Sequence, residues 1–265
     1  MKFAPLLAFT VAVATLAQDQ IVPPPKVACG DEAPHDGFEI LGGREAKTHQ
    51  HRYVAGLKTS PVNETECGGS LIAPNVVLTA AHCLSGKLRS VVVGTHYLTG
   101  FADGELANVT EEIKHPNDID VGIVILNRNI TTIQPVAVSF EYVEADVLTW
   151  VRGWGYVTSR YSGPKSQVLK ELNVTTWSNT AASDALFPIP VADTMLGAGG
   201  VKGEDACTGD SGGPLTIEEN DTVRLVGVSI WGRGCGRRGK PGVYARVSAV
   251  RDFIETYLPS NLRVS

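Results

Sequence analysis

The chain has 265 residues, of which 43% are hydrophobic and 19% charged, and its formal net charge at pH 7 is -5. These ordinary globular values exclude a disordered or collagen-like chain. The weak acidic excess, without any run of Lys and Arg, argues against a nucleic-acid partner. The length fits one all-β unit as well as two small domains, so the organisation has to be inferred along the chain.

The N-terminus has the features of a targeting segment. Lys2 precedes an apolar run over residues 3–17 that ends in small residues and is too short to span a bilayer as a helix. We predict a signal peptide over 1–17, an extracellular mature protein and no membrane association. Residues 18–39 are rich in proline and acid and are predicted to be a flexible pro-segment. Residues 40–265 form the predicted folded domain.

Short apolar segments with turn residues between them follow from residue 40 onward. Seven are β-rich: residues 70–81, 88–98, 121–127, 146–155, 170–177, 222–232 and 242–247. Many short strands at such spacing predict an all-β antiparallel sandwich or barrel. The last segment, residues 248–258, repeats its apolar residues at helical spacing and predicts a single amphipathic helix that covers the core.

Sequons and cysteines agree with an extracellular address. Five sequons of the form N-x-[ST] predict candidate glycan sites on exposed loops, of which we expect two or three to be used: Asn63, Asn108, Asn129, Asn173 and Asn220. Five cysteines suit a secreted domain with two bridges and one cysteine left over: Cys29, Cys67, Cys83, Cys207 and Cys235. No cysteine spacing matches a structural zinc site, so we expect no metal and no cofactor.

Ser211 stands in the glycine-rich stretch EDACTGDSGGPL, residues 204–215. Glycines on both sides leave the backbone free to bring N–H groups toward a carbonyl oxygen. A serine hydroxyl is a poor nucleophile unless a base activates it, and alone this stretch predicts only a turn.

A base and an acid are available elsewhere in the chain. His82 ends the apolar run LTAAHC, although a lone histidine is more often structural. Asp120 opens the apolar run DVGIVIL, where a carboxylate is costly unless it has a hydrogen-bonded partner. Asp118 competes for the same role, and we prefer Asp120 because Gly122 and the apolar run follow it directly.

The ordered set of motifs resembles the chymotrypsin/trypsin family of serine proteases. The motifs are TAAHC at 79–83, DVGI at 120–123 and GDSGGP at 209–214, together with ILGG at 40–43, CGGSLI at 67–72, GWG at 153–155, WGRGC at 231–235 and KPGVY at 240–244. The resemblance spans residues 40 to about 260. It implies two six-stranded antiparallel β-barrels, a C-terminal helix and a monomeric serine protease domain over 40–265, with the active site between the barrels.

The resemblance also implies a mechanism. Ser211 would attack a peptide carbonyl, His82 would transfer the proton, and Asp120 would hold the imidazole in the useful tautomer. The backbone N–H groups of Gly209 and Ser211 would form the oxyanion hole.

Substrate preference follows from the same resemblance. Asp205 lies six residues before Ser211, where trypsin-like members carry the acid of the primary pocket. A carboxylate there favours Arg or Lys side chains, and Gly232 and Gly242 match small pocket walls. The alternative reading of Asp205 is a solvated loop acid.

The resemblance also implies the disulfide pairing. Cys67–Cys83 would staple the loop of His82, and Cys207–Cys235 would tie the serine loop to the pocket wall. Gly197 stands where another family bridge has a cysteine, which leaves Cys29 as the odd residue.

Activation would free the α-amino group of Ile40 to pair with Asp210. However, Glu39 precedes Ile40, where a basic-specific activator would need Arg or Lys.

A second departure from the family pattern lies near the predicted catalytic residues. Ile230 stands where the family has a serine whose hydroxyl helps to hold the triad aspartate, and Ser229 lies one position earlier. Isoleucine cannot donate that hydrogen bond, so Asp120 must find another donor or lose orientation.

Two functional hypotheses follow. The first is a secreted endopeptidase that cleaves protein or peptide substrates after Arg or Lys. The second is a non-proteolytic homologue that binds a partner, because the chain is also similar to secreted oomycete trypsin-like proteins, including glucanase inhibitor proteins that bind host endoglucanases. The expected partners are therefore peptide substrates, a protease inhibitor or a host glycosyl hydrolase.

Overall fold

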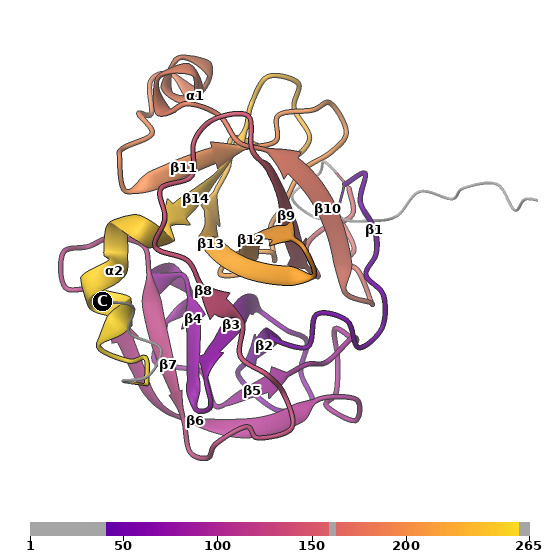
Figure 1. Ribbon diagram of the computed structural model, residues 1–265. Helices are drawn as coiled ribbons and strands as arrows, with labels where there is room; N and C mark the ends of the chain where they lie inside the picture. Colours follow the sequence, from indigo (N-terminus) through magenta and orange to yellow (C-terminus); the bar gives the residue numbers. More distant parts are fainter. Residues whose placement is uncertain (1–40, 159–162, 260–265) are drawn as a thin grey trace, which may run out of the picture. The chain divides into compact units, whose positions relative to one another are not determined.

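The computed structural model of the protein describes residues 41–158 and 163–259 (Figure 1). The predicted signal peptide and pro-segment, Cys29 and Ile40 lie outside the described residues. Within the described ranges, the helices are too short and too polar to form a membrane span.

The first half of the described chain closes into a six-stranded antiparallel barrel, in the order β2-β3-β4-β7-β6-β5. Its strands are β2 (Val54–Lys58), β3 (Cys67–Ala73), β4 (Val76–Thr79), β5 (Ser90–Val93), β6 (Glu105–Lys114) and β7 (Gly122–Leu126). β2, β4 and β5 are buried along their whole length, so these β-branched and aliphatic runs fill the barrel core. β6 mixes buried, half-buried and exposed positions because one of its faces meets solvent.

The second half, together with the short strand β1 from the start of the described chain, forms an eight-stranded sheet, drawn above the first barrel in Figure 1. Its strands are β1 (Arg44–Glu45), β8 (Ala137–Val138), β9 (Leu148–Gly153), β10 (Lys170–Thr175), β11 (Met195–Ala198), β12 (Pro214–Glu219), β13 (Thr222–Trp231) and β14 (Gly242–Arg246). The order is β1-β10-β9-β12-β13-β14-β11, and β8 pairs with β13 in parallel.

The predicted all-β fold is confirmed, with one difference in the second sheet. Its six main strands, β9 to β14, come round toward closure through an isolated bridge between Thr176 and Ala198. The short strands β1 and β8 add to these six, so the sheet has eight strands where the resemblance implied six. Both extra strands have only two residues, which is too little apolar pattern for a prediction.

The helical segments are short. The predicted C-terminal helix is present as a 3-10 turn, η2 (Val247–Val250), followed by α2 (Arg251–Glu255). The strand β4 leads into another 3-10 turn, η1 (Ala81–Cys83). The helix α1 (Asn179–Leu186) was not predicted, and it begins where the Ser178 hydroxyl accepts a hydrogen bond from the N–H of Ala181.

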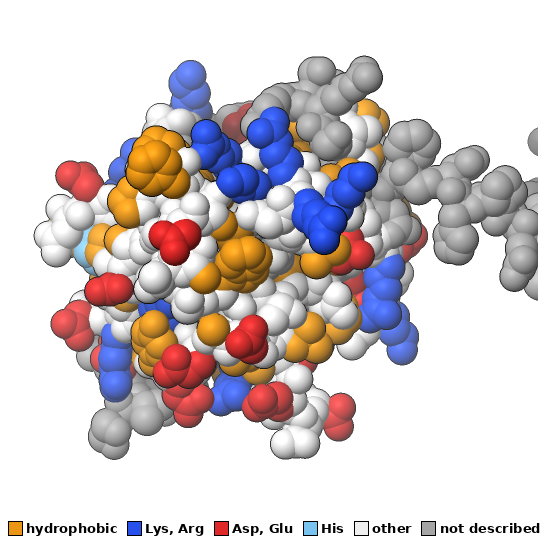
Figure 2. Space-filling model, turned by 90° about the horizontal axis from the view of Figure 1, so that it is seen from above, with side chains coloured by type: hydrophobic (Ala, Val, Ile, Leu, Met, Phe, Trp, Pro, Cys, Tyr) orange, Lys and Arg blue, Asp and Glu red, His pale blue; other side chains and the backbone are white. Residues whose placement is uncertain are grey.

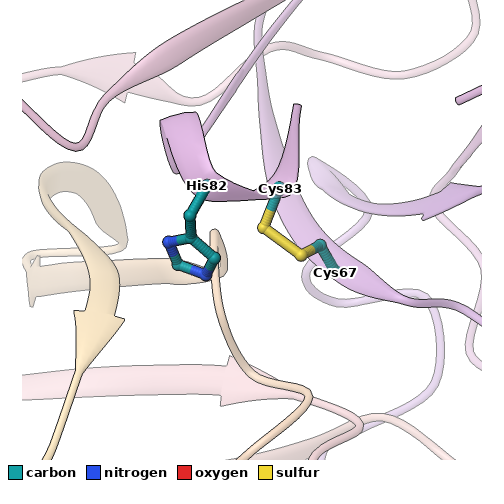
Figure 3. A group of neighbouring side chains, drawn as sticks. All are labelled: Cys67, His82 and Cys83. Atoms are coloured by element: carbon teal, nitrogen blue, oxygen red, sulfur yellow. A yellow bond between two sulfur atoms is a disulfide. The ribbon is translucent and has the colours of Figure 1, made fainter. Parts of the chain in front are cut away.

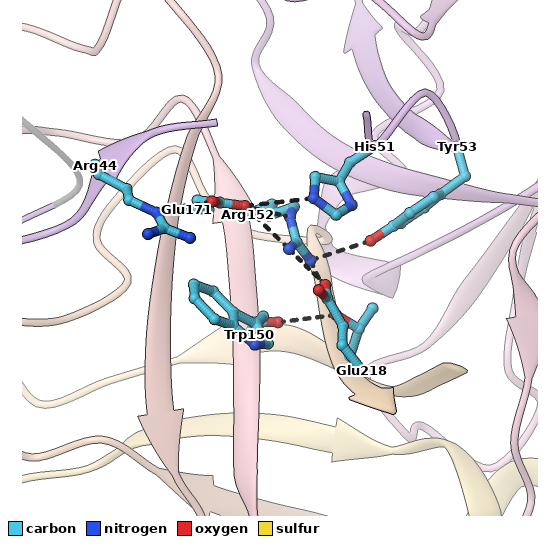
Figure 4. Close-up of polar contacts among 8 residues, drawn as sticks. Arg44, His51, Tyr53, Trp150, Arg152, Glu171 and Glu218 are labelled. Carbon is cyan, nitrogen blue, oxygen red and sulfur yellow. Dashed lines mark hydrogen bonds and ion pairs between the residues drawn. The ribbon is translucent and has the colours of Figure 1, made fainter. Parts of the chain in front are cut away.

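A buried ionic cluster joins the second sheet to the first half of the chain (Figure 4). Arg152, on β9, is 1% exposed and donates to Glu171 on β10 at 3.0 Å and to Glu218 on β12 at 2.5 Å. It also donates to the hydroxyl of Tyr53, just before β2, at 3.2 Å. His51 Nε2 lies 3.4 Å from Glu171. The cluster therefore links β9, β10 and β12 of the second sheet to Tyr53 and His51 of the first half.

Candidate functional site

His82 and Asp120 lie together at one edge of the first barrel. His82 Nδ1 is 2.7 Å from Asp120 Oδ2, and the backbone N–H of His82 donates to Asp120 Oδ1 at 2.8 Å. β4 ends just before η1 and so presents His82, while a turn closed by the His115 N–H donating to the Val121 carbonyl places Asp120 two residues before β7. Of the two candidate aspartates, Asp120 is the one that contacts the ring, whereas Asp118 is exposed with a φ of 56°.

Backbone donors hold Asp120 where the family pattern has a serine hydroxyl. Burial alone would raise the pKa of Asp120, but hydrogen bonds from the His82 ring, the His82 N–H and the Ala81 N–H outweigh it and lower the pKa. Ile230 is buried within the hydrophobic core and lies at an irregularity in the pairing of β13 with β14. Its side chain offers no donor, so two backbone N–H groups orient the carboxylate.

The serine loop packs against the strand end that leads to His82. The N–H of Gly68 donates to the carbonyl of Ser211 at 2.8 Å. Gly212 has a φ of 79°, and a Cβ there would lie 2.2 Å from Thr79 Oγ1. Only glycine permits this approach. Among the described residues, no hydrogen bond joins the Ser211 hydroxyl to His82, so the catalytic role of Ser211 stays a prediction.

The two predicted oxyanion donors have no hydrogen-bond acceptor in the described chain. Gly209 has a φ of 102°, and neither its N–H nor that of Ser211 donates to an acceptor within residues 41–158 and 163–259. Buried or half-buried N–H groups normally find a partner, so these two are available to a bound oxygen.

Cys67, His82 and Cys83 form the group of metal-ligating residue types that the described chain brings together (Figure 3). Their ligand atoms lie within 4.8 Å of one another. However, Cys67 and Cys83 are joined in a disulfide, which leaves no thiolate for a metal. The Cys67–Cys83 disulfide therefore braces the segment that carries His82. The second disulfide, Cys207–Cys235, braces the serine loop in the same way.

A cavity of about 240 Å³ opens beside Ser211. Its walls come from the serine loop, from β13 and from the segment around Cys235, and they include Gly232 and Gly242. A Cβ on Gly232 would lie 3.9 Å from the Cα of Gly242, so the two glycines face each other. Any larger side chain at either position would take up space in the cavity.

Two buried oxygen atoms without partners lie beside Gly242 in the cavity wall. One belongs to Tyr244, which lines the cavity, and the other to Asp205, which lies behind this lining; we call the two residues the cavity floor. Asp205 is 2% exposed, and its Oδ2 accepts the N–H of Gly236 at 3.0 Å, while its Oδ1 has no partner. The hydroxyl of Tyr244, which lines the cavity, also has none. A Cβ on Gly242 would be 3.2 Å from Asp205 Oδ1 and 3.5 Å from the Tyr244 hydroxyl. These atoms suit a ligand that brings hydrogen-bond donors and a positive charge.

The pKa of Asp205 also favours a positively charged ligand at the cavity floor. The pKa of Asp205 is raised to about 7, chiefly by burial and in smaller part by the nearby Asp210 carboxylate, while hydrogen bonds from Gly236 and Ala206 oppose the rise. Tyr244 was not predicted as a site residue, because a strand tyrosine in a sequence does not reveal which face it occupies. Its role emerges only from the unpartnered hydroxyl next to Asp205.

Asp210 is fully buried beneath the serine loop. Its two oxygens accept the N–H groups of Gly155 at 2.7 Å and Cys207 at 2.8 Å, and burial raises its pKa to about 6. The predicted partner, Ile40, lies outside the described residues. The next residue, Leu41, accepts a hydrogen bond from the N–H of Asp205 at 3.0 Å, so the start of the domain is held at the cavity floor.

All five sequon asparagines are exposed: Asn63, Asn108, Asn129, Asn173 and Asn220. Three lie in turns or loops, but Asn108 is on β6 and Asn173 on β10, so the expectation of loop positions is wrong for these two. Glycosylation stays a prediction at each of the five.

A closed barrel that carries a His–Asp pair, packed against a second antiparallel sheet that carries a serine loop and an acid-floored cavity, defines a trypsin-like protein. The family model described as Trypsin matches residues 40–254, and the chain belongs to that family.

Three relatives share more than a third of the aligned residues. Glucanase inhibitor protein 3 of Phytophthora sojae (strain P6497) is 37% identical over 83% of this chain and 88% of its own length. Glucanase inhibitor protein 3 of Phytophthora infestans is 37% identical, over 82% of this chain and 87% of its own. Glucanase inhibitor protein 2 of Phytophthora infestans is 36% identical, over 82% and 88%.

Proposed function

We propose that this protein acts outside the cell as a trypsin-family partner-binding protein that inhibits a secreted endoglucanase. The observation that carries the proposal is the similarity, over more than four fifths of the chain, to proteins named as glucanase inhibitors. Two disulfides support an extracellular location, since such bonds persist in oxidising compartments.

A specific observation favours a second function on the same scaffold, namely peptide hydrolysis after Arg or Lys. The His82–Asp120 contact has the geometry that a general base requires, and the cavity floor carries an acid. In this reaction Ser211 Oγ bonds to the substrate carbonyl carbon as its proton passes to His82. The protonated imidazole then gives the proton to the leaving amine, and water completes hydrolysis of the acyl-enzyme by the same route.

One experiment separates the two functions. The secreted protein, uncut and cut at a protease site engineered before Ile40, is compared with a Ser211→Ala variant in two assays. The first assay follows hydrolysis of an arginine ester, and the second follows inhibition of a panel of secreted endoglucanases.

The proposed function predicts equal inhibition by the parent protein and Ser211→Ala. The second function predicts ester hydrolysis that falls at least about 10³-fold in Ser211→Ala. Inhibition of no endoglucanase in the panel would reject the first function, and equal ester hydrolysis by parent and variant would reject the second.

A further inference from the structure

Three segments of the second half are tied into one surface beside the cavity. They are residues 185–190, which follow α1, residues 200–204 and residues 232–240, and we call their combined surface the pocket-side face. Gly203 N–H donates to the Gly236 carbonyl at 2.9 Å, and Gly239 N–H donates to the Gly200 carbonyl at 2.7 Å. The side chains of Arg233 and Lys240 donate to backbone carbonyls at the end of α1.

The pocket-side face carries a concentration of positive charge. Its basic residues are Lys202, Arg233, Arg237, Arg238 and Lys240. Against these five it has one acidic residue, Glu204, although the whole chain has a net charge of -5. Figure 2, which looks down on this end of the molecule, shows Lys and Arg side chains gathered over it with hydrophobic side chains beside them.

Three of the five basic residues form no ion pair within the described chain. In the described part of the chain, Lys202, Arg237 and Arg238 have no carboxylate within ion-pair distance, whereas Arg128 and Arg224 each pair with a glutamate at 2.9 Å or less. Like charges held close together repel one another and oppose compact packing. No carboxylate of the described chain neutralises these three charges, so they are available to a partner.

Exposed apolar side chains lie among the charges. Phe187 is 77% exposed, Val201 54% and Ile189 48%. Phe187 and Ile189 alternate with Pro188 and Pro190, whose rings restrict the backbone, so this apolar segment is stiff before any partner arrives. Arginine and aromatic side chains together are enriched at protein interfaces.

We infer that the pocket-side face is the docking surface for an acidic protein partner, whose carboxylates pair with Arg237 and Arg238 while an apolar side chain packs on Phe187. The inference rests on the proposed function in that the partner would be the inhibited glucanase. The same face borders the cavity, since Gly232, Gly234 and Cys235 line it. A docked partner would therefore cover the cavity mouth.

Charge complementarity and shape favour a protein over an anionic lipid surface. The cavity interrupts this face, and a protein can insert a side chain there while a flat bilayer cannot. In addition, an acidic partner meets the local positive charge within a Debye length of about 10 Å, where the distant acids of the chain are screened.

The test uses charge reversal with a matched control. The test variant carries Arg237→Glu and Arg238→Glu. The control variant carries Lys87→Glu and Lys114→Glu, which change the net charge by the same amount. Lys87 and Lys114 are exposed, lie in the first half and have no ion pair in the described residues. Phe187→Ala tests the apolar contact. Thermal melting checks that each variant is folded, and biosensor titrations measure the affinity for each inhibited endoglucanase at low and high salt.

We expect the Arg237/Arg238 variant to bind at least tenfold more weakly, with a flatter salt dependence, and Phe187→Ala to bind about tenfold more weakly. The Lys87/Lys114 control should bind as the parent protein does. If the parent protein inhibits an endoglucanase and both pocket-side variants keep its affinity, this docking surface is wrong while the proposed function stands.

A second arm needs no endoglucanase. A synthetic peptide of alternating glutamate and leucine, its glutamine counterpart and phosphatidylserine vesicles are titrated against the same variants at low salt. Binding of the glutamate peptide that is lost in the Arg237/Arg238 variant supports the inference even if the parent protein inhibits no glucanase. Equal binding by parent and variant, or binding of the vesicles alone, overturns it.

Discussion

Asp205 combines deep burial with a carboxyl group whose pKa is raised to about 7, chiefly by burial. The ordinary pKa of an aspartate is about 3.9, so the folded protein holds this proton over a range in which the unfolded chain releases it. Ionisation of Asp205 therefore opposes folding as the pH rises from about 4 to about 7. A bound cation would relieve that opposition, because it supplies the missing partner for Oδ1.

The first prediction concerns ligand binding at this residue. Benzamidine, a small amidinium ligand, should bind more tightly as the pH rises, with a dissociation constant that falls about tenfold per unit below pH 7 and levels off above it. Calorimetric titration between pH 5.5 and pH 8.5 measures this. Asp205→Ser should bind weakly, without the same pH dependence. A parent affinity independent of pH would show that Asp205 does not meet the ligand.

The second prediction concerns stability at the same position. Asp205→Asn removes the ionisable group and should stabilise the folded protein at pH 8 by about 4 kcal/mol, but have little effect at pH 4, where the native carboxyl is protonated. Urea unfolding at both pH values measures the difference. Destabilisation at pH 8 would mean that the charge is compensated in the folded state.

At the scale of elements, β9, β10 and β12 meet around Arg152 in a way that no single strand specifies. Burial would raise the pKa of Glu171, but hydrogen bonds from His51, Arg44 and Arg152, with the charge of Arg152, lower it to about 2. Its contribution to stability is therefore present above the ordinary pKa of about 4.3 and is lost as the pH falls toward 2.

The third prediction tests that cluster. Glu171→Gln leaves Arg152 with one fewer charged partner and should lower the free energy of unfolding by about 3 kcal/mol at pH 7, with a smaller loss near pH 2. Urea unfolding from pH 2 to pH 7 gives both values. The control is Arg44→Ala, which removes an exposed side chain that pairs with the same glutamate and should cost less than about 1 kcal/mol. If the two variants lose the same free energy of unfolding, the cluster does not stabilise the fold.

Helices and strands were predictable from sequence where the local pattern was strong. The apolar runs that became β4, β7 and β13 were recognised, and the C-terminal helical pattern corresponds to η2 and α2. β2, β6, β11, β12 and α1 were not predicted. β6 mixes polar residues into a strand with a solvent face, and α1 is a short, alanine-rich helix. Tertiary packing, rather than local propensity, stabilises β6 and α1.

At the scale of the whole molecule, the first barrel supplies His82 and Asp120, and the second sheet supplies Ser211 and the cavity. The beginning of the described domain reaches the cavity floor through Leu41, one residue after Ile40. We therefore expect a cut before Ile40 to act on the cavity through Asp210, which is fully buried.

The fourth prediction follows from this arrangement. The protein cut before Ile40 should bind benzamidine more tightly than the uncut protein, because the freed α-amino group can neutralise Asp210 and order the serine loop. Asp210→Asn should remove the difference between cut and uncut forms. N-terminal sequencing of the secreted protein then shows whether this cut occurs naturally. Identical affinities for cut and uncut parent protein would contradict the expected link.

The sequence by itself located the candidate site residues of this protein: a serine among glycines, a histidine beside a cysteine, an acid before an apolar strand and cysteines that pair as the resemblance implied. These features are local, so a short window of residues contains them. Only the tertiary structure decided that Ala81 and His82 hold Asp120, that Asp205 and Tyr244 share a cavity floor, and that three distant loops form a positive face. Such contacts join residues far apart in the chain, and they depend on strand register and sheet closure, which no local pattern encodes.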